Sequence, residues 1–390
     1  MDVLIVSLGS TAGLRAADAE LAGSLRRAGA SVAVVSASPP KRSLRTLALT
    51  DLAWALAARR AALTGLAEHR PKAIVYSSTT AALLWPRPGA IRFDAPSAGN
   101  RPGRHGLWQR PVERRRLAQA PLLLPWSEGG LVEALPDDPS AAAYARARAL
   151  VLPVPVEPSA PIPATSSAPV PARSPSRPSS APGPAPPTRD IAAIAYAANP
   201  LKKGIDRVLA AWARIRKPGE ELVLAGAPPD ELARAGVAVP SAGGEPRLGE
   251  GRVVVPKPVG DDMIGLGEGG VRVAGRLSPE EYRALLRRAR VFVCAPRRED
   301  YGIAQLEALA DGCLLVTTPA PGPYVALPIA RDLDARLVSG DLGAALRAAL
   351  DEPPADYASL AVPALVRFRR DACDRVVRDE LLPRLRTTLM

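Results

Sequence analysis

The chain has 390 residues, of which 47% are hydrophobic and 23% charged, so it is long enough to form two domains with packed cores. Its formal net charge of +12 favours anionic partners, whereas its basic residues are scattered without interleaved aromatics, which argues against nucleic acid. No stretch has the pattern of a signal peptide or a membrane span, and the three cysteines lack a C-x-x-C spacing, so we expect a soluble, cytoplasmic protein. The abundance of Ala, Arg and Pro is typical of a GC-rich bacterial genome.

The first 150 residues alternate between strand and helix patterns. Strands are predicted at 3–6, 32–35, 73–76, 91–93 and 122–125, and helices at 17–27, 47–69 and 112–119. Strands that alternate with helices predict a parallel sheet that is covered by helices on both faces. We therefore predict an N-terminal α/β domain over residues 1–150.

Between Pro158 and Thr188 the composition changes to Pro, Ser and Ala. Such a segment cannot bury enough apolar surface to order itself, and its prolines favour extended conformers. We assign residues 151–189 to a disordered linker between two domains. An arm that binds a partner is the alternative interpretation.

The second half resumes the alternation of strands and helices. Strands are predicted at 191–195, 222–224, 271–274, 291–295 and 313–316, and helices at 205–216, 279–289 and 303–311. This pattern predicts a second α/β domain over residues 190–370. An Arg- and Leu-rich amphipathic helix is predicted from about 371 to 389.

The most informative stretch of the chain runs from residue 297 to residue 318. Two carboxylates, Glu299 and Glu307, flank a Tyr301-Gly302 turn that lies between a strand and a helix. The helix that begins near Ile303 directs its unpaired N–H groups toward the carboxyl end of the sheet, which suits a phosphate. Carboxylates that accept hydrogen bonds from hydroxyls, beside amides for phosphates, indicate a site for a sugar nucleotide. The alternative is that both glutamates are solvated charges near a helix start.

The same stretch resembles the E-x7-E signature of retaining GT-B glycosyltransferases, family 4 or group 1 in type. The residues that carry the resemblance are Glu299-Asp300-Tyr301-Gly302 and Leu306-Glu307-Ala308-Leu309-Ala310-Asp311-Gly312. The family usually has Gly and Phe where this chain has Asp300 and Tyr301. The resemblance implies two Rossmann-like domains that face a central cleft, with the C-terminal helix (about 371–390) packed back onto the first domain. It also implies retention at the anomeric carbon with no metal and no cofactor other than the nucleotide-sugar co-substrate.

The resemblance assigns donor-binding roles to residues of the second domain. Glu307 would bind the ribose hydroxyls and Glu299 the transferred sugar. Lys203, together with the Tyr301-Gly302-Ile303-Ala304 segment, would hold the diphosphate. The Lys202-Lys203-Gly204-Ile205-Asp206 segment is similar to a K-G-x-D element that normally follows G-R, but Ala198 stands near the arginine position. Lys202 is expected to supply the missing charge.

Further donor-binding candidates lie in two glycine-containing loops. Gly13 and Arg15 follow the first strand, where the family brings a glycine loop close to the donor sugar. Arg276 lies in a loop that is similar to the family's loop near the donor base. A tight turn and a solvated arginine are the alternative interpretations of these residues.

The loop after the strand at 91–93 contains two candidates for the acceptor site. Asp94 stands near a position where the family often has histidine, and a carboxylate there can orient an acceptor hydroxyl or take its proton. His105 is one of two histidines, and its ordinary pKa suits proton transfer, although it is equally explained as a surface residue.

From these features we expect a glycosyltransferase that moves a hexose-type sugar from a nucleotide sugar to an acceptor hydroxyl. The acceptor would be a glycan, a lipid-linked sugar or a small molecule. The basic residues, including those of the C-terminal helix, would allow peripheral contact with the anionic inner face of a membrane. The alternatives are a non-catalytic nucleotide-sugar binder of the same fold, or a nucleotide-sugar hydrolase or epimerase.

Overall fold

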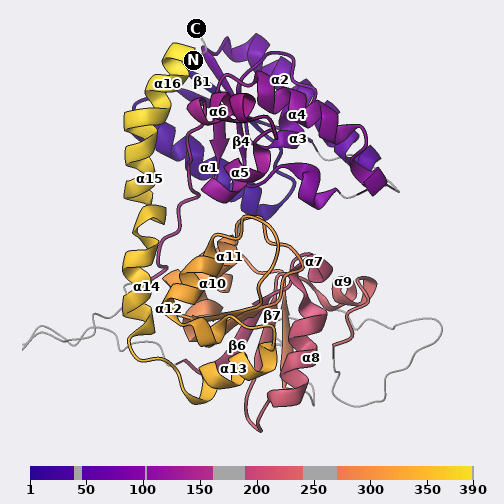
Figure 1. Cartoon of the computed structure of the whole chain (residues 1–390), viewed down its shortest axis with the longest axis vertical. Coiled ribbons are helices and arrows are strands. Elements are labelled where there is room, and N and C mark those ends of the chain that lie inside the picture. The colour runs from indigo at the N-terminus through magenta and orange to yellow at the C-terminus, as the bar shows by residue number, and fades with distance from the viewer. Residues whose placement is uncertain (39–45, 102, 161–188, 240–269, 389–390) are drawn as a thin grey trace, which may run out of the picture.

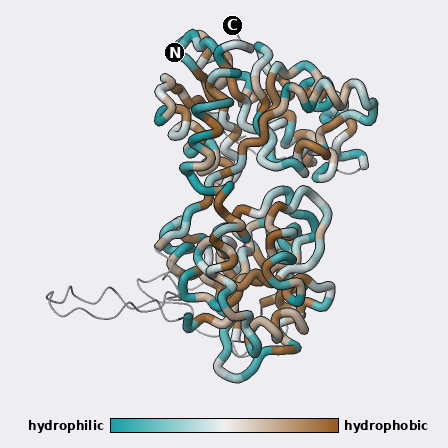
Figure 2. The backbone as a smooth tube through the Cα atoms, turned by 60° about the vertical axis from the view of Figure 1, so that its left-hand side comes forward, coloured by the Kyte–Doolittle hydropathy of each residue, from teal (hydrophilic) through white to brown (hydrophobic). Residues whose placement is uncertain are grey.

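The chain forms two α/β lobes that lie one above the other along the longest axis of the molecule (Figures 1 and 2). The structure is a computed structural model and describes residues 1–38, 46–101, 103–160, 189–239 and 270–388. Most of the predicted linker therefore lies outside the described residues. Both chain ends lie on the first lobe (Figure 2).

The first lobe is built on a five-stranded parallel sheet with the order β2-β1-β3-β4-β5. Its strands are β1 (Val3–Ser7), β2 (Val32–Ser36), β3 (Ala73–Tyr76), β4 (Ala90–Phe93) and β5 (Leu123–Pro125). Its helices are α1 (Ala12–Arg27), α2 (Leu47–His69), α3 (Thr79–Ala82), α4 (Gln109–Gln119), α5 (Glu128–Ala134) and α6 (Pro139–Ala147), with short 3₁₀ turns η1 (Ser97–Asn100) and η2 (Gly103–Gly106). Four of the five strands are apolar and largely buried, as a parallel sheet between helices requires.

The second lobe repeats this architecture with the strand order β10-β9-β6-β7-β8. Its strands are β6 (Ile191–Tyr196), β7 (Leu222–Ala225), β8 (Val271–Gly275), β9 (Ala289–Cys294) and β10 (Leu314–Thr317). Its helices are α7 (Pro200–Lys203), α8 (Ile205–Ile215), α9 (Pro229–Arg234), α10 (Pro279–Arg288), α11 (Ile303–Ala310), α12 (Ala326–Leu333), α13 (Leu342–Asp351) and α14 (Tyr357–Leu365), with the 3₁₀ turns η3 (Ala335–Leu337) and η4 (Val366–Phe368). Two parallel sheets of five strands confirm the predicted α/β fold class.

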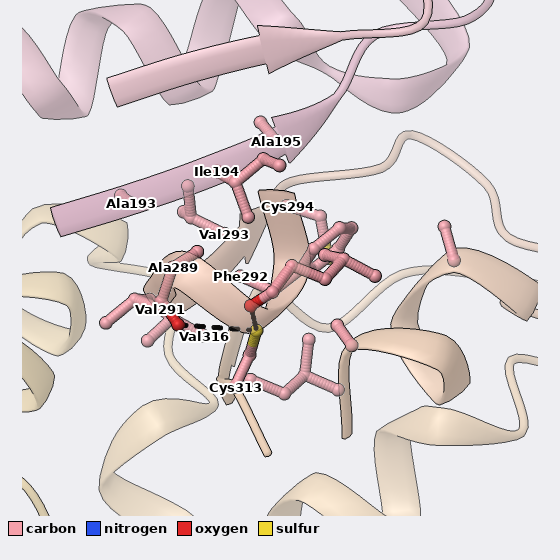
Figure 3. Close-up of a cluster of buried hydrophobic side chains, with 14 of the residues drawn as sticks. Ala193, Ile194, Ala195, Ala289, Val291, Phe292, Val293, Cys294, Cys313 and Val316 are labelled. Carbon is pink, nitrogen blue, oxygen red and sulfur yellow. Dashed lines mark hydrogen bonds between the residues drawn. The ribbon is translucent and has the colours of Figure 1, made fainter. Parts of the chain in front are cut away.

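The core of the second lobe includes the buried side chains of the adjacent strands β6, β9 and β10 (Figure 3). Phe292 and Val293 of β9 are almost completely buried there, beside Ile194 of β6. Two of the three cysteines lie in this core and all three are buried free thiols. The Cys313 thiol is directed at the carbonyl oxygen of Ala289 at 3.6 Å, and burial raises its pKa to about 12.

The chain crosses between the lobes twice. Leu152 packs in the core of the first lobe and Val154 in that of the second, so the outward crossing lies between them. The returning segment runs beside the outward one, because the Val156 amide donates to the Phe368 carbonyl at 2.7 Å. The Arg370 amide likewise donates to the Glu157 carboxylate at 2.6 Å.

The C-terminal helical segment consists of α15 (Arg370–Val376), the π-helical turn η5 (Val377–Leu381) and α16 (Leu382–Thr388). It runs along the side of both lobes, in yellow in Figure 1, and ends on the first. Its apolar side chains Val377, Leu381, Leu382 and Leu385 are buried in the core of the first lobe. The apolar face of this helix is therefore occupied by packing within the molecule. None of the described helices is both long enough and apolar enough to span a bilayer.

Candidate functional site

The loop between β9 and α11 carries the two carboxylates that the sequence singled out. Gly302 ends this loop in the left-handed conformation, with φ of +96°, and α11 begins at the next residue. A Cβ at Gly302 would lie 3.3 Å from the Tyr324 ring, so both its conformation and its surroundings favour glycine. The turn aims the first N–H groups of α11 out of the helix, where an anion can accept them.

Glu299 lies under this turn and is only 5% exposed. Its Oε2 accepts hydrogen bonds from Lys203 Nζ at 2.6 Å and from Gln305 Nε2 at 2.9 Å. Because both donors reach the same oxygen, Oε1 remains available for a ligand hydroxyl. Gln305 is buried, and its own Oε1 has no hydrogen-bond partner among the described residues.

Glu307 stands one turn into α11 and keeps 27% of its side chain exposed. Burial raises the pKa of Glu307 to about 7; the Arg283 guanidinium opposes this shift and the Asp311 carboxylate adds to it. Arg283 Nη1 lies 3.6 Å from Glu307 Oε1. The same arginine donates to Asp311 and to the carbonyl of Glu157 in the interdomain segment, so its guanidinium is fixed in position.

Two tyrosines complete the surroundings of Glu307. The rings of Tyr196 and Tyr282 lie 5.4 Å apart between centroids. Burial raises the pKa of each phenol, and the negative charge of Glu307 raises both further, which places Glu307 beside the pair. The buried Tyr282 hydroxyl has no hydrogen-bond partner among the described residues. An aromatic pair beside a carboxylate is an arrangement that suits a nucleoside.

Lys203 reaches Glu299 because the turn that carries it is held against the end of β9. Gly204 adopts φ of +66°, and a Cβ there would lie 1.9 Å from the carbonyl oxygen of Ala295. The amide of Arg297 donates to the Lys202 carbonyl at 2.9 Å and fixes the same turn. The position of the Lys203 ammonium therefore depends on the absence of a side chain at residue 204.

We predict that Gly204→Ala destabilises the protein by about 3 kcal/mol or more, because the new methyl group overlaps a backbone oxygen in addition to the left-handed strain. Gly219→Ala is the matched control, since Gly219 also has a positive φ (+82°) but nothing lies within 4 Å of the added methyl. We expect that control to lose only about 1 kcal/mol. Urea denaturation measures both changes, and equal losses would contradict the proposed packing of the turn.

Lys202 faces the first lobe rather than the signature loop. Its Nζ donates to Asp300 Oδ2 at 2.5 Å and to Asn100 Oδ1 at 3.1 Å. Asn100 Nδ2 in turn donates to Asp300 Oδ2 at 2.9 Å, so these three residues join the two lobes. Although burial opposes its ionisation, the Lys202 charge and these hydrogen bonds lower the pKa of Asp300. The charge that Lys202 was expected to contribute to a diphosphate is thus balanced by Asp300.

Arg298 makes a second bridge between the lobes. It donates to Asp300 Oδ1 at 2.8 Å and to Glu133 of α5 at 2.5 Å. Its guanidinium lies over Gly99, where a Cβ would come within 2.3 Å of it. The polar contacts of Asn100, Glu133, Lys202, Arg298 and Asp300 therefore hold the loop after β9 against the first lobe.

Asp94 follows β4 on the first lobe and is partly buried. Its Oδ1 accepts a hydrogen bond from the Ala95 amide at 2.8 Å. Burial, and then the nearby charge of Asp300, raise the pKa of Asp94 to about 6, while Lys202 opposes this shift. Asp94 is therefore close enough to the interdomain cluster to interact with it electrostatically.

His105 is placed differently from Asp94. It is exposed on η2 and makes no hydrogen bond or ion pair with any described residue. The structure does not join it to Asp94 or Glu299.

Gly13 lies at the start of α1 and faces α11 across the lobes. A Cβ on Gly13 would lie 3.9 Å from Ile303 Cδ1, so the glycine loop of the first lobe meets the N-terminus of α11. Arg15 is exposed, and its Nη1 donates to the Gly9 carbonyl at 2.8 Å within its own loop. Arg276 is also exposed and pairs with Glu231 of α9 at 2.6 Å, not with Glu307.

The Tyr301 side chain points away from the turn into the interdomain packing. Its ring meets Trp126 of the first lobe edge-on at 5.3 Å, and its hydroxyl accepts a hydrogen bond from the Val154 amide at 3.1 Å. Trp126 also contacts the buried Arg92, whose guanidinium lies 5.0 Å from the ring centroid. The backbone of Tyr301 therefore belongs to the candidate site, whereas its ring does not.

Sequence reasoning missed several residues that complete the site, namely Asn100, Tyr196, Tyr282, Arg283, Arg298 and Gln305. Most have partners about 30 to 200 positions away, and no local pattern carries that information. Asp300 had a signal, because it replaces the glycine of the signature and a replaced glycine introduces a side chain that needs a partner. Gln305 also had a signal, because it is polar and lies two positions before Glu307 in an otherwise apolar helix.

Residues 189–351 match the family model of glycosyl transferases group 1, while no curated protein matches the chain. Three solved structures are similar over nearly their full length. WaaG, a glycosyltransferase involved in lipopolysaccharide biosynthesis, is 15% identical with a TM-score of 0.58, over 96% of this chain and 99% of that chain. Anabaena Alr3699/HepE in complex with UDP is 13% identical with a TM-score of 0.57, over 98% of this chain and 99% of that chain. A trehalose-6-phosphate synthase is 11% identical with a TM-score of 0.61, over 98% of this chain and 99% of that chain.

These similarities establish the fold of this chain. The two parallel sheets of five strands and their helices correspond to the two Rossmann-like domains of GT-B glycosyltransferases. The GT-B fold predicted from the signature is therefore confirmed. The matched family model covers the second domain, which contains Lys203, Glu299 and Glu307.

Proposed function

We propose that this protein is a retaining, metal-independent glycosyltransferase that moves a hexose-type sugar from a nucleotide-sugar donor to an acceptor hydroxyl. The observation that carries the proposal is the Lys203–Glu299 pair at the loop before α11, with Glu307 one turn into the same helix. The match of this domain to group 1 glycosyl transferases supports it. The arrangement offers carboxylates to hydroxyl groups and N–H donors to phosphates, which are the two chemical parts of a nucleotide sugar.

The donor would lie along α11 with its nucleoside at Glu307. There the carboxylate accepts hydrogen bonds from the ribose hydroxyls, and the Tyr196–Tyr282 pair lies beside it. The diphosphate would receive the first N–H groups of α11 and the Lys203 ammonium. An ammonium has three donors, so Lys203 can keep its bond to Glu299 and still donate to a phosphate oxygen. The free oxygen of Glu299 would accept a hydrogen bond from the sugar.

In the reaction, the bond between the anomeric carbon and the diphosphate oxygen breaks, and a bond from the anomeric carbon to the acceptor oxygen forms. Negative charge then grows on the leaving diphosphate, where the α11 amides and Lys203 stabilise it. The acceptor hydroxyl approaches from the first lobe, where Asp94 would orient it and take its proton as the oxygen bonds to the anomeric carbon. With a pKa of about 6, Asp94 is mostly ionised at neutral pH.

Asp300→Asn tests the role of Asp94 through the pH dependence of transfer. The negative charge of Asp300 is the second cause of the raised pKa of Asp94, after burial. Its removal should therefore lower that pKa. With the donor saturating, so that Glu307 is already bound to the ribose, the acid limb of kcat/KM for the acceptor should shift to lower pH by up to about one unit. If the acid limb stays in place or moves to higher pH, the ionisation of Asp94 does not control the pH dependence of transfer.

One observation favours a second candidate, namely nucleotide-sugar binding without transfer. Ala198 offers no charge, and Lys202 is engaged by Asp300 and Asn100, so of these three positions Lys203 alone offers a cation to the loop before α11. Transfer with a single cation would then depend on the helix amides for the rest of the charge stabilisation.

The purified protein incubated with a panel of nucleotide sugars, with and without candidate acceptors, distinguishes these functions. The proposal predicts nucleoside diphosphate release that depends on an acceptor and a glycoside product of unchanged anomeric configuration, unaffected by EDTA. Release without acceptor would indicate hydrolysis. Saturable binding of a donor without release, across glycan, lipid-linked and small-molecule acceptors, would support the binding function instead.

A further inference from the structure

Helix α2 packs on the first lobe with its small side chains inward. Ala55, Ala58 and Ala62 are completely buried. Gly65 lies so close to the sheet that a Cβ there would come within 2.9 Å of Leu4. The centre of the buried face of α2 therefore consists of Ala and Gly, and Trp54 and Leu66 also pack against the core.

Three leucines of α2 lie on its outer face. Leu49, Leu56 and Leu63 are 50%, 40% and 47% exposed. They are seven positions apart, so the helical repeat places them in one row, opposite the alanine face. Single exposed leucines are ordinary on protein surfaces, but a row along one helix indicates a surface that is covered by a partner. We refer to these three residues as the leucine row.

Arginines lie within and beside the leucine row. Arg60 follows Leu56 by four positions and lies on the same face of α2, with Arg59 next to it. Helix α4, which α3 separates from α2, exposes Arg114 and Arg115. Among the described residues, none of these four arginines forms an ion pair. Burial lowers the pKa of Arg116, and Arg59 and Arg115 both lie close enough that their charges lower it further. Figure 1 shows α2, α3 and α4 on the same side of the first lobe.

Acidic residues are nearly absent from this surface. Asp51 of α2 is buried in an ion pair with Arg101, and Glu113 of α4 is buried against Ser97. On α2 the remaining carboxylate, Glu68, lies at the last turn, beyond the leucine row. The outer face of α2 and α4 is thus apolar along its centre and positively charged around it.

We propose that the leucine row and Arg59, Arg60, Arg114 and Arg115 form a docking surface for an anionic phospholipid bilayer. A bilayer supplies both an apolar layer for the leucines and negative headgroups for the arginines. A second copy of the chain is disfavoured as the occupant, because a symmetric contact through α2 would bring the same uncompensated arginines together. The C-terminal helix is not this surface, since its apolar side chains are buried in the first lobe. The inference does not depend on the proposed sugar transfer.

Flotation of the full-length protein with vesicles tests the inference. The probes are vesicles of phosphatidylcholine alone and of phosphatidylcholine with phosphatidylglycerol. The test variant is Leu49→Ser/Leu56→Ser/Leu63→Ser. The matched control is Leu360→Ser/Val362→Ser/Val366→Ser, which removes side chains of similar exposure (52%, 44% and 52%) from the second lobe.

We expect the wild-type protein to bind the anionic vesicles, with binding that weakens as salt is added. The leucine-row variant should lose about ten-fold or more of its partition coefficient, whereas the control should bind like wild type. Arg60→Gln/Arg114→Gln/Arg115→Gln should bind more weakly and show a smaller dependence on salt. Circular dichroism should show the same helix content in every variant, so that lost binding is not lost folding.

Three outcomes would overturn the inference. The first is absence of wild-type binding to anionic vesicles, and the second is equal binding by the leucine-row variant and the control. The third is a wild-type dimer that the leucine-row substitutions convert to a monomer in analytical ultracentrifugation, since a second copy would then cover the row.

Discussion

Lys203→Met is expected to lower the free energy of unfolding by about 2–3 kcal/mol, because it leaves the Glu299 carboxylate buried without its cation. Glu299 is 5% exposed, and its ion pair with Lys203 spans 2.6 Å, while Gln305 alone would remain to hold it. Denaturation in urea measures the change. Lys217→Met is the matched control, because the Lys217–Asp351 pair is open to solvent on both sides and should contribute less than about 1 kcal/mol.

A double variant separates the stability of this pair from its function. Lys203→Met/Glu299→Gln removes both charges and should recover most of the stability lost in Lys203→Met. It should not recover nucleoside diphosphate release, since the proposed cation beside the diphosphate and the sugar-binding carboxylate are both absent. A double variant that is no more stable than Lys203→Met would contradict the ion pair, and one that transfers sugar at the wild-type rate would contradict the assigned roles.

Glu307→Gln is expected to stabilise the protein without ligand and to weaken nucleotide binding. Burial raises the pKa of Glu307 from 4.5 to about 7, so the protonated form is favoured in the folded state. Its contribution to stability is therefore greatest below pH 4.5 and is lost as the pH rises through 7. Glutamine stays neutral, so the variant should exceed wild type by about 1–3 kcal/mol at pH 8 and by little near pH 4.5.

Whereas Glu307→Gln should raise the stability of the protein at pH 8, it should lower the affinity for a nucleoside diphosphate. Ribose hydroxyls donate to the ionised carboxylate, so wild-type binding should weaken as the pH falls below about 7, whereas binding by the variant should be weaker and nearly independent of pH. Thermal denaturation from pH 4.5 to 8 measures the change in stability, and calorimetric titration from pH 5 to 8 measures the change in affinity. Glu280→Gln, on an exposed position of α10, is the control and should change neither. A variant with wild-type affinity at pH 8 would remove Glu307 from the donor site.

The sequence predicted the strands, several of the longer helices and the turn that carries the candidate site where the relevant information is local, but it did not predict α12, α13 or α14. The signature at Glu299–Gly302 combines a strand end, a glycine turn and a helix start, and each has a short-range pattern that survives in the structure. The bounds of α2 were predicted without error from its composition. The packing of α2 was not predicted, because a composition rich in alanine and leucine does not determine that the alanines face the sheet.

The remaining parts of the site depend on contacts between distant segments. Lys202 and Lys203 are neighbours in the sequence, yet one pairs with Asp300 and Asn100 of the interdomain cluster and the other with Glu299. The turn at Gly204 follows them directly and packs against the Ala295 carbonyl, just after β9, so closely that a Cβ would overlap it. His105 shows the converse case, because its chemistry made it a candidate while its exposed position on η2 leaves it without a partner among the described residues.

The most direct test of the proposed donor site is a crystal structure of the protein with a bound nucleoside diphosphate. We expect Glu307 to contact the ribose hydroxyls, and the diphosphate to lie on the N–H groups of Ile303 and Ala304 within hydrogen-bond distance of Lys203. A diphosphate bound elsewhere, with Lys203 and Glu307 both free of ligand, would contradict it.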